Sequence, residues 1–225
     1  MIFLLFGMTA SGKTTIGKVI ARLLKCQFID LDARIVQDVN MSVRSFYTKC
    51  GKVSFQRIES DMLKKTLLQC KRDENENLFV ISAGGGLIEN QCAIDFLIAI
   101  FTKESQDIAI FFLDMPAKIL WKRLLRKAKK EKSFPAFLKI TEKAISSPSK
   151  KVDFQSLYRA KFLSTYKKRM LLFRNVKEKI SLIKIKCKRK TVRQIAKIAL
   201  KKASFSHYKP SVSTQKSLTF LKFSI

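Results

Sequence analysis

The stretch Gly7-Met8-Thr9-Ala10-Ser11-Gly12-Lys13-Thr14 directly follows the apolar run 2–6 and opens a helix-forming segment at 13–24. This G-x-x-x-x-G-K-T spacing between a strand and a helix is typical of a phosphate-binding loop, or P-loop. Backbone N–H groups of the loop and of the helix N-terminus cradle phosphate, the lysine reaches the β- and γ-phosphates, and the threonine hydroxyl ligates Mg²⁺. A chance match on a glycine-containing turn is disfavoured because both flanks are present. We therefore expect ATP and Mg²⁺ as ligands, with ATP contacts from Gly7, Ala10, Ser11, Gly12, Lys13, Thr14 and Thr15.

The composition favours one compact domain in a reducing compartment. The chain has 225 residues, 47% of them hydrophobic, which suits a single sizeable core. Its apolar runs are too short or too interrupted to cross a bilayer, so we expect neither a signal peptide nor a membrane span. Five scattered cysteines without C-x-x-C spacing favour a cytoplasmic protein. The single histidine, His207, leaves no Ser/His/Asp triad, so proton transfer is expected to use carboxylates.

Apolar runs bounded by turn signals alternate with longer helical patterns, which predicts an α/β fold with a five-stranded parallel sheet. We expect strands at 2–6, 27–29, 78–82, 108–113 and 180–185, and helices at 13–24, 55–69, 90–101, 116–129, 154–173 and 191–202. The polar, lysine-rich segment at about 129–151 is interpreted as a mobile lid. The domain is expected to span 1–203, and 204–225 to form a weakly ordered basic tail.

Positive charge is concentrated in the second half of the chain. Residues 1–117 carry 14 Lys and Arg against 13 Asp and Glu, whereas 118–225 carry 32 against 4. One interpretation is a surface for nucleic acid or an anionic membrane, since clustered cations release counterions on binding. The other is solvated helix faces together with a positive lid over an anionic nucleotide and substrate. We favour the second, because no recognition helix or aromatic RNA platform accompanies the charge. We accordingly expect a monomer that acts on a small molecule, without a membrane partner.

Two carboxylates follow the second expected strand, in the run Phe28-Ile29-Asp30-Leu31-Asp32. Alternation along a strand places both on one side at its C-terminal end, the edge where open α/β sheets bind ligands. We expect Asp30 to orient Mg²⁺ together with Thr14, and Asp32 to accept or position the proton of an attacking hydroxyl. Lys13 and Asp32 are thus the expected catalytic residues. The alternative is a helix-capping acid and a surface acid.

The third expected strand ends in Ser82-Ala83-Gly84-Gly85-Gly86. Three successive glycines weaken a strand or helix, but they let backbone N–H groups approach a ligand closely. The structural alternative is a tight turn into the next helix. Because the run follows a strand of the expected sheet, we favour substrate or γ-phosphate contacts from Gly84, Gly85 and Gly86.

The P-loop, the D-x-D pair and the triple glycine, in this order, resemble the shikimate kinase family, P-loop kinases related in fold to the nucleoside monophosphate kinases. The likeness covers most of 1–202. It includes 51–59, where the family has a G-E-x-x-F-R-x-x-E pattern, Arg123 ten residues after Leu113, and the run 135–138 at the lid.

The resemblance implies transfer of the γ-phosphate of ATP to the 3-hydroxyl of shikimate, a step towards chorismate and the aromatic amino acids. Lys13 and Thr14 would then handle phosphate and Mg²⁺, and Asp32 would hold the substrate hydroxyls and act as base. Gly85 would contact substrate, and Arg123 would lie against adenine.

Three positions depart from the family pattern at its ligand-binding arginines. Gln56 stands where the F-R arginine belongs, Phe134 precedes the lid proline, and Phe154 falls four residues before Tyr158, where an R-x-P-L-Y arginine is expected. Each lost charged hydrogen bond costs about 1.5–3 kcal/mol, and a bidentate guanidinium is hard to replace. Cations within a few residues offer compensation. Of these, Arg57 is assigned to substrate binding, and the others are Lys132, Lys151 and Arg159.

Three hypotheses follow for the function. We favour a divergent shikimate kinase that uses Mg-ATP and a small-molecule substrate. A second hypothesis keeps the nucleotide site but changes the acceptor to another small hydroxyl compound, such as a sugar acid or a nucleotide. The third is a shikimate-kinase-like protein without kinase activity that binds nucleic acid or a partner through its basic C-terminal half.

Overall fold

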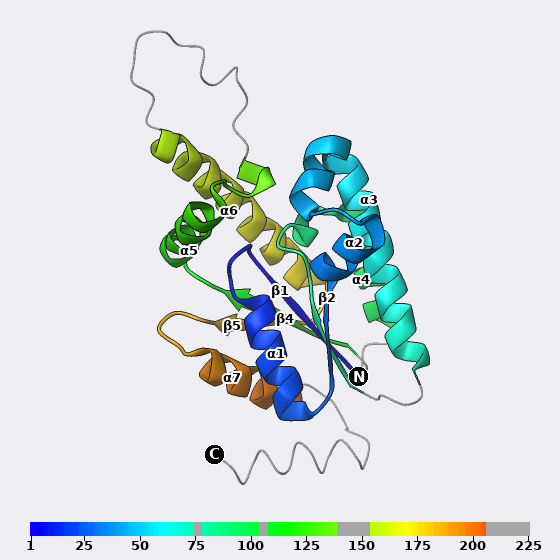
Figure 1. The fold of residues 1–225 in the computed structure, drawn as a ribbon. Coiled ribbons are helices and arrows are strands. Elements are labelled where there is room, and N and C mark those ends of the chain that lie inside the picture. The colour runs from blue at the N-terminus through cyan, green and yellow to red at the C-terminus, as the bar shows by residue number, and fades with distance from the viewer. Residues whose placement is uncertain (74–77, 104–107, 139–153, 206–225) are drawn as a thin grey trace, which may run out of the picture.

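Five parallel strands form the centre of the protein, in the order β2-β3-β1-β4-β5 (Figure 1). The computed structural model describes residues 1–73, 78–103, 108–138 and 154–205. The strands are β1 (Ile2–Gly7), β2 (Gln27–Asp30), β3 (Phe79–Ser82), β4 (Ile108–Asp114) and β5 (Leu182–Lys186). The predicted five-stranded parallel α/β fold is therefore confirmed.

Helices cover both faces of this sheet (Figure 1), namely α1 (Lys13–Leu24), α2 (Leu31–Val39), α3 (Val43–Arg72), α4 (Gln91–Lys103), α5 (Ala117–Glu131), α6 (Phe154–Lys179) and α7 (Val192–Phe205). In β1, Phe3 and Leu5 belong to the hydrophobic cluster that contains α1 and α7. Leu4 and Phe6 belong to the opposite cluster, which contains α3 and α4. Because the central strands are buried on both sides, they read as continuous apolar runs.

The register of the sheet brings the ends of three strands together. Leu5 of β1 pairs with Ser82 of β3, and Ser82 also pairs with Asp30 of β2. Since the strands are parallel, the segments that follow them all leave the same edge of the sheet. This register places the P-loop, the first acid and the triple glycine side by side.

The helices differ from the predicted ones in length and in number. The predicted helix at 55–69 is the second part of α3, which is interrupted at Gly51 with φ 81° and ψ 177°. The helix α2 was not predicted, because it begins directly after Asp30, the last residue of β2, and buries only Leu31 and Ile35. Two short 3-10 helices, η1 (Leu87–Glu89) and η2 (Ala136–Leu138), were not predicted either.

The predicted lid and tail lie mostly outside the described residues. Of the lid at about 129–151, only residues up to 138 are described, and these complete α5 and form η2. The tail predicted from 204 onwards begins inside α7, which extends to Phe205, and 206–225 lie outside the described residues. No helix in the described part of the chain is both long enough and apolar enough to span a membrane.

Leu4 on the central strand β1 is 0% exposed, so we expect its truncation to reduce the stability of the protein strongly. Leu4→Ala should lower the free energy of unfolding by about 2–5 kcal/mol, since it removes buried methyl groups and leaves a cavity. The same substitution at Leu171, a side chain on α6 that is 55% exposed, should change it by no more than about 0.5 kcal/mol. Urea unfolding of both variants measures the difference, and equal effects would contradict this account of the core.

Candidate active site

The P-loop connects β1 to the N-terminus of α1 and borders a cavity of about 490 Å³. Gly12 begins the helix with φ 99°, a conformation that favours glycine. Ser11 N donates to Met8 O at 3.0 Å, which closes the turn of the loop. Among the described residues, the buried hydroxyl of Ser11 has no hydrogen-bond partner. A loop at a helix N-terminus with a spare hydroxyl is suited to bind phosphate oxygens.

Lys13 is folded back onto the loop that carries it. Its Nζ atom donates to Gly7 O at 3.0 Å and to Met8 O at 3.2 Å, and the residue is 8% exposed. Burial lowers the pKa of Lys13 to about 8, against the opposing effect of the nearby Asp32 and Asp30 carboxylates. The ammonium group is therefore positively charged at neutral pH and lies beside the loop that would hold a triphosphate.

The two predicted acids lie near each other but on different elements. Asp30 ends β2 and caps α2, where its Oδ1 accepts from Ala33 N at 3.3 Å. Asp32 lies in the first turn of α2, so the prediction that both acids share one side of a strand was wrong. The chain turns into a helix at Leu31, and the helix itself brings Asp32 to the cavity. Burial raises the pKa of Asp32, and the positive charges of Lys13 and Lys127 oppose this shift.

The donor set at the end of β2 fits a magnesium ion. Thr14 Oγ1 donates to Asp30 Oδ2 at 2.7 Å. A hydroxyl and a carboxylate oxygen are the kind of hard ligands that Mg²⁺ accepts, with the remaining positions taken by water and by phosphate oxygens of the substrate. The residues predicted as metal ligands are thus brought together in a suitable arrangement.

The triple glycine packs against the P-loop and against charged side chains. A Cβ atom on Gly85 would lie 2.8 Å from the Thr9 nitrogen, which leaves no room for a side chain. A Cβ atom on Gly84 would lie 2.5 Å from Glu59 Oε1 and 3.0 Å from Asp32 Oδ1. Gly85 lines the cavity, whereas Gly84 and Gly86 are not among its lining residues. The glycines therefore allow close packing of the site as well as an approach to a ligand.

Arg169 is a buried guanidinium beside this turn that the sequence analysis missed. Its Nε and Nη2 donate to Glu89 Oε2 at 3.1 and 2.9 Å, and its Nη1 donates to Gly85 O at 3.0 Å. The residue is 3% exposed and stacks over the Phe137 ring at 4.8 Å. The signal was present in the sequence, because the run 169–173, Arg-Met-Leu-Leu-Phe, has the arginine of the R-x-P-L-Y pattern, which the run that ends at Tyr158 lacks.

The alignment that placed Phe154 at the arginine position is corrected by this geometry. Phe154 is 51% exposed at the start of α6, about four turns before the arginine. Gln56, at the position of the F-R arginine, donates from its Nε2 to Glu89 O at 2.8 Å. Arg57 is exposed and, like Arg169, is not among the residues that line the cavity, so its role in substrate binding stays a prediction.

Glu59 is a buried carboxyl group on α3 that faces the triple glycine. Asn90 Nδ2 donates to its Oε2 at 3.2 Å, while Oε1 has no hydrogen-bond partner in the described part of the chain. The residue is 2% exposed, and burial raises its pKa from an ordinary value of 4.5 to about 7. The hydrogen bond from Asn90 opposes this shift.

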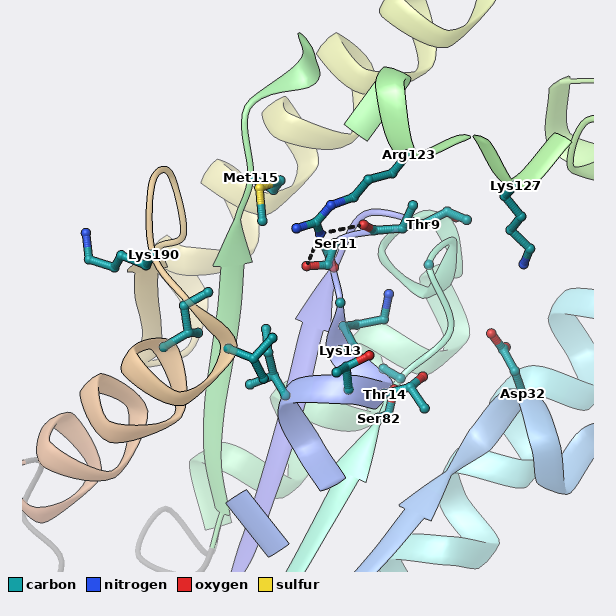
Figure 2. Close-up of a pocket in the computed structure, with 18 residues that line it drawn as sticks. Thr9, Ser11, Lys13, Thr14, Asp32, Ser82, Met115, Arg123, Lys127 and Lys190 are labelled. Carbon is teal, nitrogen blue, oxygen red and sulfur yellow. Dashed lines mark hydrogen bonds between the residues drawn. The ribbon is translucent and has the colours of Figure 1, made fainter. Parts of the chain in front are cut away.

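Arg123 holds the opposite side of the P-loop. Its Nη1 donates to Ala10 O at 3.0 Å and to Ser11 O at 3.2 Å (Figure 2). The cavity continues past Arg123 towards side chains from the start of α7 and the loop before it, namely Lys190, Val192 and Ile195. Of the predicted ATP contacts, Ala10, Ser11, Gly12, Lys13, Thr14, Thr15 and Arg123 all line the cavity, whereas Gly7 does not. The contact of Arg123 with adenine stays a prediction.

A P-loop at the end of β1, facing two acids and a glycine turn across a parallel sheet, defines a P-loop kinase fold. The family model for shikimate kinase matches residues 9–200. The chain therefore belongs to the shikimate kinase family.

Curated relatives agree with this family. The shikimate kinase of Macrococcus caseolyticus is 36% identical over 97 residues, which cover 43% of this chain and 53% of the relative. That of Chlorobium chlorochromatii is 30% identical over 126 residues, covering 56% of this chain and 59% of the relative. The chain thus spans little more than half the length of these relatives.

Solved structures share the fold over nearly the whole chain. The shikimate kinase of Acinetobacter baumannii in complex with shikimate has a TM-score of 0.64 at 22% identity, covering 92% of this chain and 94% of that one. A gluconokinase of Sinorhizobium meliloti has a TM-score of 0.54 at 14% identity, covering 90% and 91%. At these identities the likeness shows the fold.

The raised pKa of Glu59 predicts a pH dependence of stability. The carboxyl group of Glu59 has a pKa of 4.5 in the unfolded chain and of about 7 in the folded protein, so the folded state binds the proton more tightly. The stabilisation is present below pH 4.5 and is lost as the pH rises to about 7. Relative to Glu59→Gln, the wild type should lose ~3 kcal/mol of unfolding free energy over this range. Urea unfolding at several pH values measures it.

Glu178→Gln is the matched control, since Glu178 is exposed on α6. Its pH profile should follow that of the wild type. Parallel profiles for the wild type and Glu59→Gln would contradict the buried, protonated state of Glu59.

Proposed function

We propose that this protein is an ATP-dependent kinase that transfers the γ-phosphoryl group of ATP to the 3-hydroxyl of shikimate. The observation that carries the proposal is that Lys13, Thr14, Asp32 and Gly85 line the same cavity, which joins the phosphate-binding loop to an acid and to the glycine turn. Membership of the family supports shikimate as the acceptor. A cytoplasmic location and a monomeric state accompany this proposal as predictions.

Asp32 is the proposed base for the acceptor hydroxyl. It lines the cavity at the start of α2, and its pKa is raised by burial, so that it can accept a proton more readily than an exposed aspartate. Lys13 would turn from the carbonyls of Gly7 and Met8 to the phosphates when ATP binds. Its charge would then offset the charge that develops on the transferred group.

Thr14 and Asp30 would hold Mg²⁺, directly or through water. The bound ion supplies charge neutralisation at the β- and γ-phosphates. The residues of this chain do the rest: the P-loop orients the triphosphate, and Asp32 positions the hydroxyl in line with it.

Arg169 is the proposed ligand for the carboxylate of the acceptor. A guanidinium has five N–H donors, and three are used by Glu89 and Gly85. Two donors remain for a substrate carboxylate. Because Glu89 and the Gly85 carbonyl hold the group in place, little side-chain entropy would be lost on binding.

The proposal predicts shikimate-dependent release of ADP. A coupled assay with Mg-ATP should show turnover with shikimate and only background without it, and gluconate serves as an alternative acceptor. Lys13→Ala should abolish turnover without unfolding the protein, and Asp32→Asn should lower kcat by about 10²-fold or more while ATP affinity is kept. No turnover with shikimate, in material that binds ATP, would refute the acceptor. Full activity of Asp32→Asn would dismiss Asp32 as base.

Arg169 predicts a specific effect on the acceptor. Arg169→Lys keeps the positive charge but loses the forked geometry, so the KM for shikimate should rise about tenfold or more while the affinity for ATP stays the same. The matched control is Arg174→Lys, because Arg174 is exposed on the same helix. An unchanged KM in Arg169→Lys would show that this guanidinium serves only to hold the glycine turn.

A further inference from the structure

Lys127 projects into the cavity from α5, on the side where the acceptor would bind. It is among the lining residues, and Figure 2 shows its ammonium group pointing towards Asp32. The P-loop motif does not include it, and neither does any other motif identified in the sequence. Lys127 therefore lies in the cavity without a role in the proposed function.

Four cationic side chains line the cavity in the described part of the chain: Lys13, Arg123, Lys127 and Lys190. Arg123 is engaged by the carbonyls of Ala10 and Ser11. Lys190 lies on the far side of the cavity from Asp32 (Figure 2). This leaves Lys13 on the side of the P-loop and Lys127 across from it to face a terminal phosphoryl group.

The residue before Pro135 cannot supply this charge. Phe134 stacks on Tyr158 with ring centroids 4.1 Å apart and on Trp121 with centroids 5.8 Å apart. It belongs to a hydrophobic cluster and carries no donor. Among the described residues that line the cavity, Lys127 on α5 is therefore the cation placed to neutralise the outer oxygens of the phosphoryl group from the acceptor side.

Lys127 is free to change its partner. Its present ion pair with Glu131 spans 3.6 Å, and the two side chains are 54% and 50% exposed. Exposed pairs of this kind contribute little to stability. Exchanging the Glu131 carboxylate for a phosphate would thus meet little resistance.

We propose that Lys127 binds the γ-phosphoryl group of ATP from the acceptor side and stays bound to it during transfer. The proposal rests on the proposed phosphoryl transfer, but the nucleotide part of it does not depend on which acceptor is used. It makes Lys127 a second cation for the group that moves, opposite Lys13.

Calorimetric titration with two nucleotides tests the contact without turnover. In Mg²⁺ buffer, Lys127→Gln should weaken binding of the ATP analogue AMP-PNP about tenfold or more, because a charged hydrogen bond to the γ-phosphate is lost, and should leave ADP binding unchanged. Lys127→Arg should restore most of the difference. The matched control, Lys130→Gln, changes an exposed lysine on α5 that does not line the cavity and should alter neither affinity.

Turnover supplies the second readout. With shikimate as acceptor, Lys127→Gln should lower kcat more than tenfold and change the KM for shikimate less than twofold, while Glu131→Gln should not lower kcat. An unchanged preference for AMP-PNP over ADP in Lys127→Gln, or an equal loss of both nucleotides, would overturn the proposal. A wild type that binds AMP-PNP but is inactive with shikimate would refute the acceptor alone, and the nucleotide titration would still decide the role of Lys127.

Discussion

The contact between the Gly85 turn and the backbone of Thr9 sets the geometry of the whole site. Parallel pairing of β1 with β3 brings the two loops to the same edge, and Ala83 N donates to Leu5 O at 3.0 Å where the strands end. A glycine at 85 then allows backbone to lie directly on backbone. The phosphate-binding loop and the glycine turn thus lie in direct contact, so their separation is fixed by the sheet and does not depend on flexible side chains.

Around this contact, buried side chains of opposite charge lie next to one another. Lys13 lies near Asp30 and Asp32, and Arg169 lies near Glu59 and Glu89. Each group is held close to a partner, yet in the described part of the chain one oxygen of Glu59 has no hydrogen-bond partner, and the pKa of Glu59 is raised to about 7. Buried groups of this kind reduce stability and are characteristic of functional sites. The fold itself therefore places these charges beside the glycine turn.

Much of the fold follows from the sequence because its signals are local. The P-loop, the apolar strands and the glycine run are each recognisable from consecutive residues, and all were placed correctly. The helix α2 was not, because only Leu31 and Ile35 are buried on it. Asp32 was expected near Asp30 and does lie near it, but it belongs to α2 and not to the end of the strand.

The remaining parts of the site depend on contacts between distant segments. Arg169 lies 80 residues from Glu89 and 84 from Gly85 along the chain. The motif was expected at the start of α6, whereas the arginine lies about four turns further along this helix. Gln56 donates to a carbonyl 33 residues away, which no spacing rule predicts. The cavity-facing position of Lys127 depends on how α5 is rotated about its axis, and local propensity does not determine this.

The aromatic stack of Trp121, Phe134 and Tyr158 joins α5, the segment before η2 and α6 through contacts between rings. Dissolved salt screens and weakens a salt bridge between such elements, but it leaves stacked rings largely unaffected. Cohesion between rings is also maintained on moderate warming, because the hydrophobic contribution weakens on cooling. The contact between α5, the segment before η2 and α6 is consequently expected to tolerate changes in ionic strength.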